Sequence, residues 1–113
     1  MNVTDSLPVN YAAERVATAH VDIALAARLI VDPEMNLADA RVVLQRLTVE
    51  RTFLTAHLST VADQVARLPV TEQAEALARD LRPLTLAVES AAMALARLRR
   101  AIAEIETKTG AAR

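Results

Sequence analysis

The 113-residue chain is poor in the residues that build disulfides, tight turns and sheets. It contains no cysteine and one glycine, and aromatic residues make up 2% of it. Without cysteine, neither a disulfide nor a thiolate metal ligand can form. Hairpin turns use glycine, and strands favour β-branched and aromatic side chains. Their scarcity therefore argues against a β protein.

The chain also lacks a charge imbalance and a long apolar run. Its formal net charge is −1, which gives no bulk attraction to nucleic acid or anionic lipid. No apolar run approaches the roughly 20 residues that a transmembrane helix needs. Residues 1–8 have neither the basic flank nor the apolar core of a signal peptide. We expect no membrane span and a cytoplasmic location. Twelve arginines against one lysine, with 24 alanines, are typical of a GC-rich bacterial genome.

Apolar residues with helical spacing are abundant. Hydrophobic residues make up 53% of the chain, and their spacing alternates between three and four residues over two long segments. This alternation is the heptad pattern of helices that pack against other helices. In the later segment the pattern comprises Val70, Ala74, Leu77, Leu81, Leu84, Val88, Ala91, Leu95, Leu98, Ile102 and Ile105. In the earlier segment it comprises Leu37, Ala40, Leu44, Leu47, Arg51, Leu54, Leu58, Val61, Val65 and Leu68.

Prolines and caps divide the chain into three helices. Pro33 ends a first helix of about residues 9–31, and Asn36 is a good cap for a second helix of about residues 36–68. Pro69 ends the second helix, and a third covers about residues 71–107. Because the connections are short, consecutive helices are antiparallel neighbours. The sequence predicts a single all-α domain, an antiparallel up-down-up three-helix bundle of long coiled-coil-like helices.

Pro83 lies inside the third predicted helix. Proline there removes a hydrogen bond and clashes with the preceding turn. Since the heptad pattern keeps its phase across this position, we predict a helix that is kinked at Pro83, with a break into two helices as the alternative. The tip of the second and third helices, about residues 58–82, is expected to extend beyond the first helix.

Seven apolar residues lie away from the heptad positions. They either widen one internal face or form an interface, and a contiguous exposed set usually marks an interface. We predict self-association through them, most simply as a homodimer, or contact with another helical protein. The residues are Leu25, Leu29, Val42, Val49, Phe53, Leu86 and Met93.

Two polar residues occupy apolar positions. Arg51 lies in the heptad pattern of the second helix, and His20 lies at the edge of the apolar stripe of the first, at nearly the same level. They form either a polar layer that fixes register or oligomeric state, or a solvated pair in which the arginine stem packs and its head reaches water.

The sequence carries no pattern typical of catalysis. Dinuclear metal sites in helical bundles need Glu-x-x-His, and neither His20 nor His57 has a glutamate three residues earlier. The one glycine, Gly110, is too near the C-terminus to belong to a phosphate-binding loop. We therefore expect no catalytic, cofactor or metal site, and not an enzyme.

A basic cluster offers a second functional interpretation. It comprises Arg82, Arg97, Arg99 and Arg100, which could contact phosphates, although interleaved glutamates are more typical of a solvated face. The predicted function is a non-enzymatic protein–protein interaction module: an adaptor, a small regulator or an assembly component. The alternative is an oligomeric nucleic-acid-associated regulator that uses these arginines. A ligand-binding bundle with an apolar cavity among its alanines is a third, weaker hypothesis.

Overall fold

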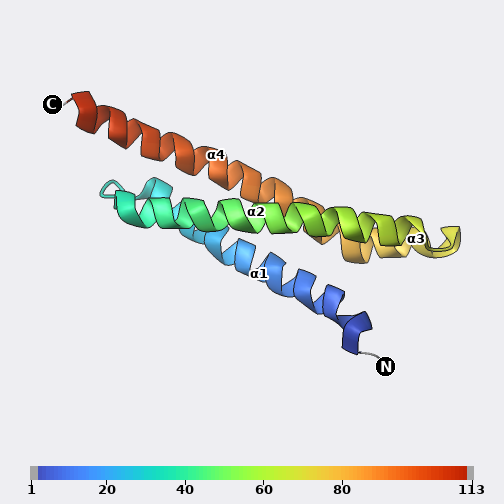
Figure 1. Cartoon of the computed structure of the whole chain (residues 1–113). Coiled ribbons are helices and arrows are strands. Elements are labelled where there is room, and N and C mark those ends of the chain that lie inside the picture. Colours follow the sequence, from blue (N-terminus) through green and yellow to red (C-terminus); the bar gives the residue numbers. More distant parts are fainter. Residues whose placement is uncertain (1–2, 112–113) are drawn as a thin grey trace.

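The chain forms an all-α three-helix bundle, as predicted (Figure 1). The computed structural model describes the backbone of residues 3–111 and the side chains of residues 14–109. The described elements are α1 (Val3–Val31), α2 (Leu37–Ala66), α3 (Val70–Ala76), the π-helical turn η1 (Leu77–Leu81) and α4 (Arg82–Ala111). Because α3, η1 and α4 follow one another without a gap, they form a single helical run.

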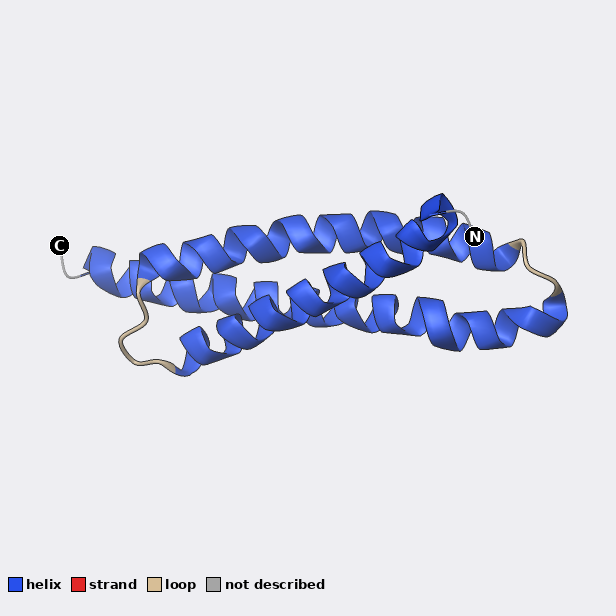
Figure 2. Ribbon diagram, turned by 90° about the horizontal axis from the view of Figure 1, so that it is seen from below, coloured by secondary structure: helices blue, strands red, loops and turns tan. Residues whose placement is uncertain are grey.

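The bundle is elongated. α1 and α4 run in the same direction and α2 runs against both, so the two ends of the chain lie at opposite ends of the molecule (Figures 1 and 2). The principal extents are 63 × 25 × 18 Å and the radius of gyration is 17.7 Å. A compact domain of 100 residues would have a radius of about 13 Å. Each pair among α1, α2 and α4 is in contact. Within the described part of the chain, none of the helices has the length and apolar character to cross a membrane.

The helix boundaries follow local chemistry, with one correction. The side chain of Asn36 caps α2 as predicted, because its Oδ1 accepts hydrogen bonds from the backbone nitrogens of Ala38 at 2.8 Å and Asp39 at 3.2 Å. α1 begins at Val3, whereas the sequence predicted a start near residue 9. Pro8 is the sixth residue of α1, so its missing N–H removes one hydrogen bond of the second turn.

The proline of the third predicted helix is accommodated by η1. The backbone N–H of Arg82 donates to the carbonyl of Leu77, a five-residue step that closes the wider π turn just before Pro83. The helix therefore continues across the proline, and the alternative of a break into two helices is wrong. One extra residue in a turn rotates the preceding segment by about 100°. The predicted phase is consequently lost before Pro83: Val70 of α3 and Leu77 of η1 are exposed, and Ala76 of α3 is buried.

The hydrophobic core consists of two clusters along the bundle. Towards the α1–α2 connection, a cluster forms around Ala26 of α1, Leu47 of α2 and Leu98 of α4. Towards the hairpin tip, another forms around Ala19, Leu54 and Leu84. The five largest fully buried apolar side chains belong to α2 and α4: Leu47, Leu54, Leu84, Leu95 and Leu98. Among its described residues, α1 contributes only Ala19 and Ala26 to the buried apolar set.

Truncation of Leu47 tests this core. Leu47 is completely buried, so Leu47→Ala should lower the free energy of unfolding by about 2–5 kcal/mol through lost burial and a cavity. The matched control is Val42→Ala on the same helix, where 54% of the side chain is exposed; it should change stability by no more than about 0.5 kcal/mol. Urea unfolding followed by circular dichroism measures both. Equal losses in the two variants would contradict this description of the core.

Candidate interaction surface

One side of α2 forms a long exposed strip without charge. Eight residues share it by their helical spacing, and all are exposed: Ala38, Val42, Gln45, Val49, Thr52, Phe53, Ala56 and Thr60. We call these residues the α2 outer face. From Ala38 to Thr60 it extends about 33 Å at 1.5 Å per residue. Val42, Val49 and Phe53 are 54%, 46% and 45% exposed, so the apolar side chains of this face are available to a partner.

Phe53 marks the edge of this face that borders α1. The guanidinium of Arg15 lies over its ring, 4.5 Å from the centroid, in a cation–π contact between the two helices. Arg15 therefore covers part of Phe53, which remains 45% exposed.

Leu25 and Leu29 do not belong to an exposed surface. Both are half-buried and pack against the core cluster around Leu47 and Leu98. Their packing against the core favours the alternative prediction, a widened internal face, and their assignment to an interface stays a prediction.

The predicted apolar and basic residues of α4 share one side of that helix. Leu86 and Met93 are 55% and 58% exposed, and they alternate along it with charged residues. We call this set the α4 outer face: Arg82, Leu86, Glu89, Met93, Arg97, Arg100 and Glu104, all of them exposed. Arg99 is exposed too but lies about 100° around the helix from Arg100. The exposed residues of the predicted interface therefore lie on two helices. Their surroundings are uncharged on α2 and charged on α4.

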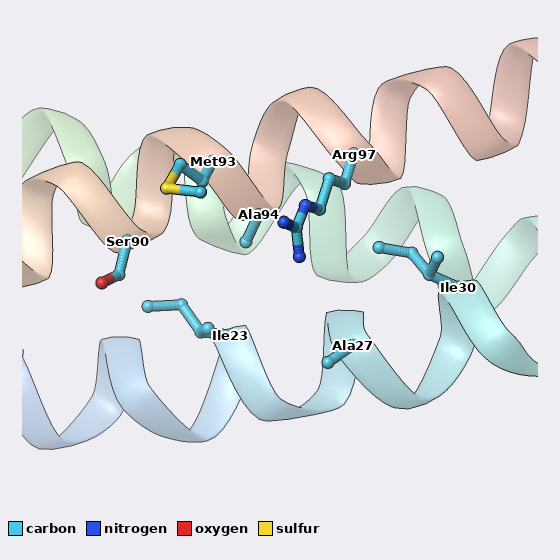
Figure 3. A pocket seen from close by; sticks show the side chains of 7 residues that line it. All are labelled: Ile23, Ala27, Ile30, Ser90, Met93, Ala94 and Arg97. Atoms are coloured by element: carbon cyan, nitrogen blue, oxygen red, sulfur yellow. The ribbon is translucent and has the colours of Figure 1, made fainter.

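A shallow groove separates α1 from α4 beside Met93 (Figure 3). It encloses about 200 Å³. Ile23, Ala27 and Ile30 of α1 face Ser90, Met93, Ala94 and Arg97 of α4 across it. The small side chains of Ala27 and Ala94 leave this hollow, and Arg97 reaches from α4 towards α1 between Ala94 and Ile30.

The polar layer lies at residues other than those predicted. His20 and Arg51 are both exposed, so they do not form it. The buried polar residues of the described chain are Asp22 of α1, with no exposed surface, and Glu50 of α2, which is 5% exposed. α2 packs against both α1 and α4, so the buried side of this helix differs from the one that the heptad pattern predicts. It includes Glu50, whereas Arg51, at the heptad position, is exposed.

The two acids occupy the gap between the two core clusters. Asp22 lies between Ala19 and Ala26 on α1, and Glu50 lies between Leu47 and Leu54 on α2. Nη2 of Arg46, from the surface of α2, forms an ion pair with Oδ1 of Asp22 at 3.0 Å. No well-aligned N–H among the described residues donates to either oxygen of Asp22 or to Oε2 of Glu50. A proton held between the two acids supplies the missing donor.

Burial raises the pKa of Glu50 from its ordinary 4.5 to about 8. The hydrogen bond to Asp22 and the negative charge of Asp22 raise this pKa as well, and the positive charges of Arg46 and Arg15 lower it. At neutral pH Glu50 is therefore mostly protonated and donates to Asp22. The combination of a neutral acid, a carboxylate and an arginine gives the buried layer no net charge.

Helical spacing contained a signal for this pair that heptad analysis missed. Asp22 is spaced three and four residues from the buried alanines, and Glu50 has the same relation to Leu47 and Leu54. Acidic residues are almost never fully buried unless they are paired, so such positions are ordinarily assigned to the surface. Only the packing of α1 on α2 brings the two acids together.

Comparison of the chain with known protein families, curated proteins and solved structures finds no match. The features of this chain that bear on its function are therefore the outer faces of α2 and α4 and the buried acids. Within the described residues, no group of three or more histidines, aspartates or glutamates is placed to hold a metal ion. Asp22 and Glu50 are only two ligands, and Arg46 adds a positive charge beside them.

The raised pKa of Glu50 predicts a pH-dependent stability. A group whose pKa is higher in the folded state contributes stability fully below its unfolded value, near 4.5, and loses it as pH rises through about 8. The free energy of unfolding should therefore fall across this window, by at most about 1.4 kcal/mol per pH unit for one proton. Urea unfolding at several pH values measures the slope.

Glu50→Gln is the informative variant for that slope. It keeps the shape of the side chain and a hydrogen-bond donor towards Asp22, and it cannot ionise, so the slope should become nearly flat. Asp63→Asn, at an exposed acid of the same helix, is the matched control and should keep the wild-type slope. An undiminished slope in Glu50→Gln would contradict the assignment.

Proposed function

We propose that this chain is a non-enzymatic interaction module that self-associates through the α2 outer face. The observation that carries the proposal is the uncharged exposed strip from Ala38 to Thr60, with Val42 and Val49 along it and Phe53 at its edge. The centres of protein interfaces are depleted of charged residues and enriched in aromatic side chains, and this strip has both properties. The module would act as an adaptor, a small regulator or an assembly component.

A second copy of the chain is a chemically suitable partner for this face. In a two-fold dimer the same patch meets itself, so every residue at its centre approaches an identical residue or a neighbour. A charged centre would be repelled, whereas an uncharged strip of valines, alanines and threonines is compatible with itself. Two such helices packed side by side would bury the exposed apolar side chains of both.

The α4 outer face is less suitable for self-contact. Arg82, Arg97 and Arg100 lie among its apolar residues, and a two-fold contact would bring arginines of both copies near one another. We therefore assign the homodimer contact to α2, and the faces can be separated by mutation.

Charged substitutions on the two faces test the proposal. Val42→Glu combined with Val49→Glu should convert the dimer to a monomer, because it places four like charges at the contact. The matched control is Leu86→Glu combined with Met93→Glu on α4, which should leave the mass unchanged. Light scattering on a sizing column over a range of concentrations measures mass, and circular dichroism verifies folding. A wild-type monomer at all concentrations, or a dimer that survives the α2 changes, would overturn the assignment.

A second candidate function is supported by the arginines of α4. Arg82, Arg97, Arg99 and Arg100 are exposed, and none has an ion pair with another described residue. Three of them share the α4 outer face, over about 27 Å from Arg82 to Arg100. Guanidinium groups so placed could contact the phosphates of a nucleic acid.

This alternative predicts salt-dependent binding to a DNA duplex. The logarithm of the binding constant should fall linearly with the logarithm of salt concentration, and Arg97→Ala with Arg100→Ala should reduce that slope by about two. Arg28→Ala, at an exposed arginine of α1, is the control and should leave the slope unchanged. Fluorescence anisotropy with a labelled duplex measures it. Binding that the α4 changes do not weaken, or no binding at low salt, would exclude the alternative.

A further inference from the structure

α1 is held on the bundle differently from the other helices. Its described residues contribute two alanines and one aspartate to the buried interior, whereas every large, fully buried apolar side chain comes from α2 or α4. Larger side chains of α1, such as Ile23 and Ile30, are only half-buried. Apolar stabilisation scales with the area buried, so α1 gains less from packing than α2 and α4 gain from each other.

The buried polar residue of α1, Asp22, contacts Arg46 and Glu50 of α2. On α1, Asp22 lies between Ala19 and Ala26. Ala19 belongs to one core cluster and Ala26 to the other. While α1 is docked, Asp22 has no exposed surface and Glu50 almost none. If α1 leaves, water reaches both carboxyl groups. Docking thus disfavours the ionised form of Glu50, and release favours it.

Three charged groups act on Glu50, and the charge that changes with pH in this site is that of Glu50 itself. The charged groups that act on it are Asp22 and Arg15 from α1 and Arg46 from α2 itself. His57 lies two turns further along α2 and is half-buried. On α4, Ala87 packs in the cluster of Leu54 and Ala94 in that of Leu47, so α4 presents alanines on either side of this level.

We propose that Asp22 and Glu50 form a proton-dependent latch that docks α1 on the hairpin made by α2, α3, η1 and α4. With one proton shared by the pair, α1 is docked. When that proton is lost, two carboxylates face each other in a buried site, and α1 releases. We expect the hairpin to persist, because leucines of α2 and α4 share each core cluster: Leu47 with Leu95 and Leu98, and Leu54 with Leu84.

The direction of the pH effect follows from Glu50. Its pKa is about 8 in the docked state and near 4.5 when solvated, so docking is strongest in acid and weakens as pH rises through this range. Over the steep part of the window the ratio of released to docked molecules should increase up to about tenfold per pH unit. Above about pH 8 the ratio should level off. This latch is independent of the proposed dimer and would operate in a monomer.

Spin-label distances test the latch directly. The chain has no cysteine, so labels can be placed by single changes: Ala17→Cys on α1 with Ala96→Cys on α4, both at exposed alanines. We expect one short distance near pH 5 and a growing population of long distances towards pH 8. A second pair, Gln45→Cys on α2 with Ala103→Cys on α4, reports on the hairpin and should not change. Light scattering at the same pH values distinguishes a change of mass from the opening of a single chain.

Two variants separate the latch from general loosening. Glu50→Gln should keep the α1–α4 distance short at every pH, and Asp63→Asn should titrate like the wild type. As a measurement that needs no substitution at Glu50, the carboxyl carbon shift of Glu50 by NMR should titrate with the same midpoint as the distance change. A constant distance up to pH 9, an unchanged opening in Glu50→Gln, separate midpoints, or simultaneous loss of the hairpin distance would each overturn the proposal.

Discussion

The contact between Asp22 and Glu50 is the point on which the arrangement of the three helices depends. It lies where a continuous hydrophobic core would be expected and divides that core into two clusters. A buried acid pair is tolerated only with a partner charge and a proton, and Arg46 and the raised pKa of Glu50 supply these. Because the acids come from different helices, they are satisfied together only when α1 and α2 are in one register. The register of α1 against α2 is thus connected to the protonation of Glu50. The two acids also occupy space in the core that apolar side chains would otherwise fill.

This constraint also explains why α1 contributes alanines to the core while α2 and α4 contribute leucines. Ala19 and Ala26 allow α1 to approach closely enough for Asp22 to reach Glu50, but small side chains bury little area. α2 and α4 carry the leucines and form the durable part of the bundle. α2 uses one broad arc against both neighbours, and the opposite side remains exposed from Ala38 to Thr60. That side carries no charge, although nothing in the internal packing requires it to be uncharged.

Much of the fold could be predicted from the sequence because it depends on local signals. The spacing of leucines in α2 and α4, the cap at Asn36 and the prolines at positions 33 and 69 each act over a few residues. The heptad phase of α3 could not be predicted, because the extra residue in the π turn η1 rotates α3 about the helix axis relative to α4. The buried acids were missed for another reason: Asp22 and Glu50 are stable inside only as a pair, and pairing is a property of the packed helices. The surface predictions at Val42, Val49 and Phe53 concern exposed positions of one helix, whereas Leu25 and Leu29 depend on how α1 and α2 meet.

Arg15 joins the latch to the α2 outer face. Its guanidinium lies over the ring of Phe53, at the edge of that face, and its charge acts on Glu50. Release of α1 would remove Arg15 from both, leaving Phe53 without its cation–π partner. A partner that binds the α2 outer face with Arg15 in place would therefore favour docked α1, and by thermodynamic reciprocity docked α1 would favour that partner. Rising pH should then weaken self-association as well as docking, whereas Glu50→Gln should make both independent of pH. The two proposals can thus be true separately, and Arg15 is the residue through which they would be coupled.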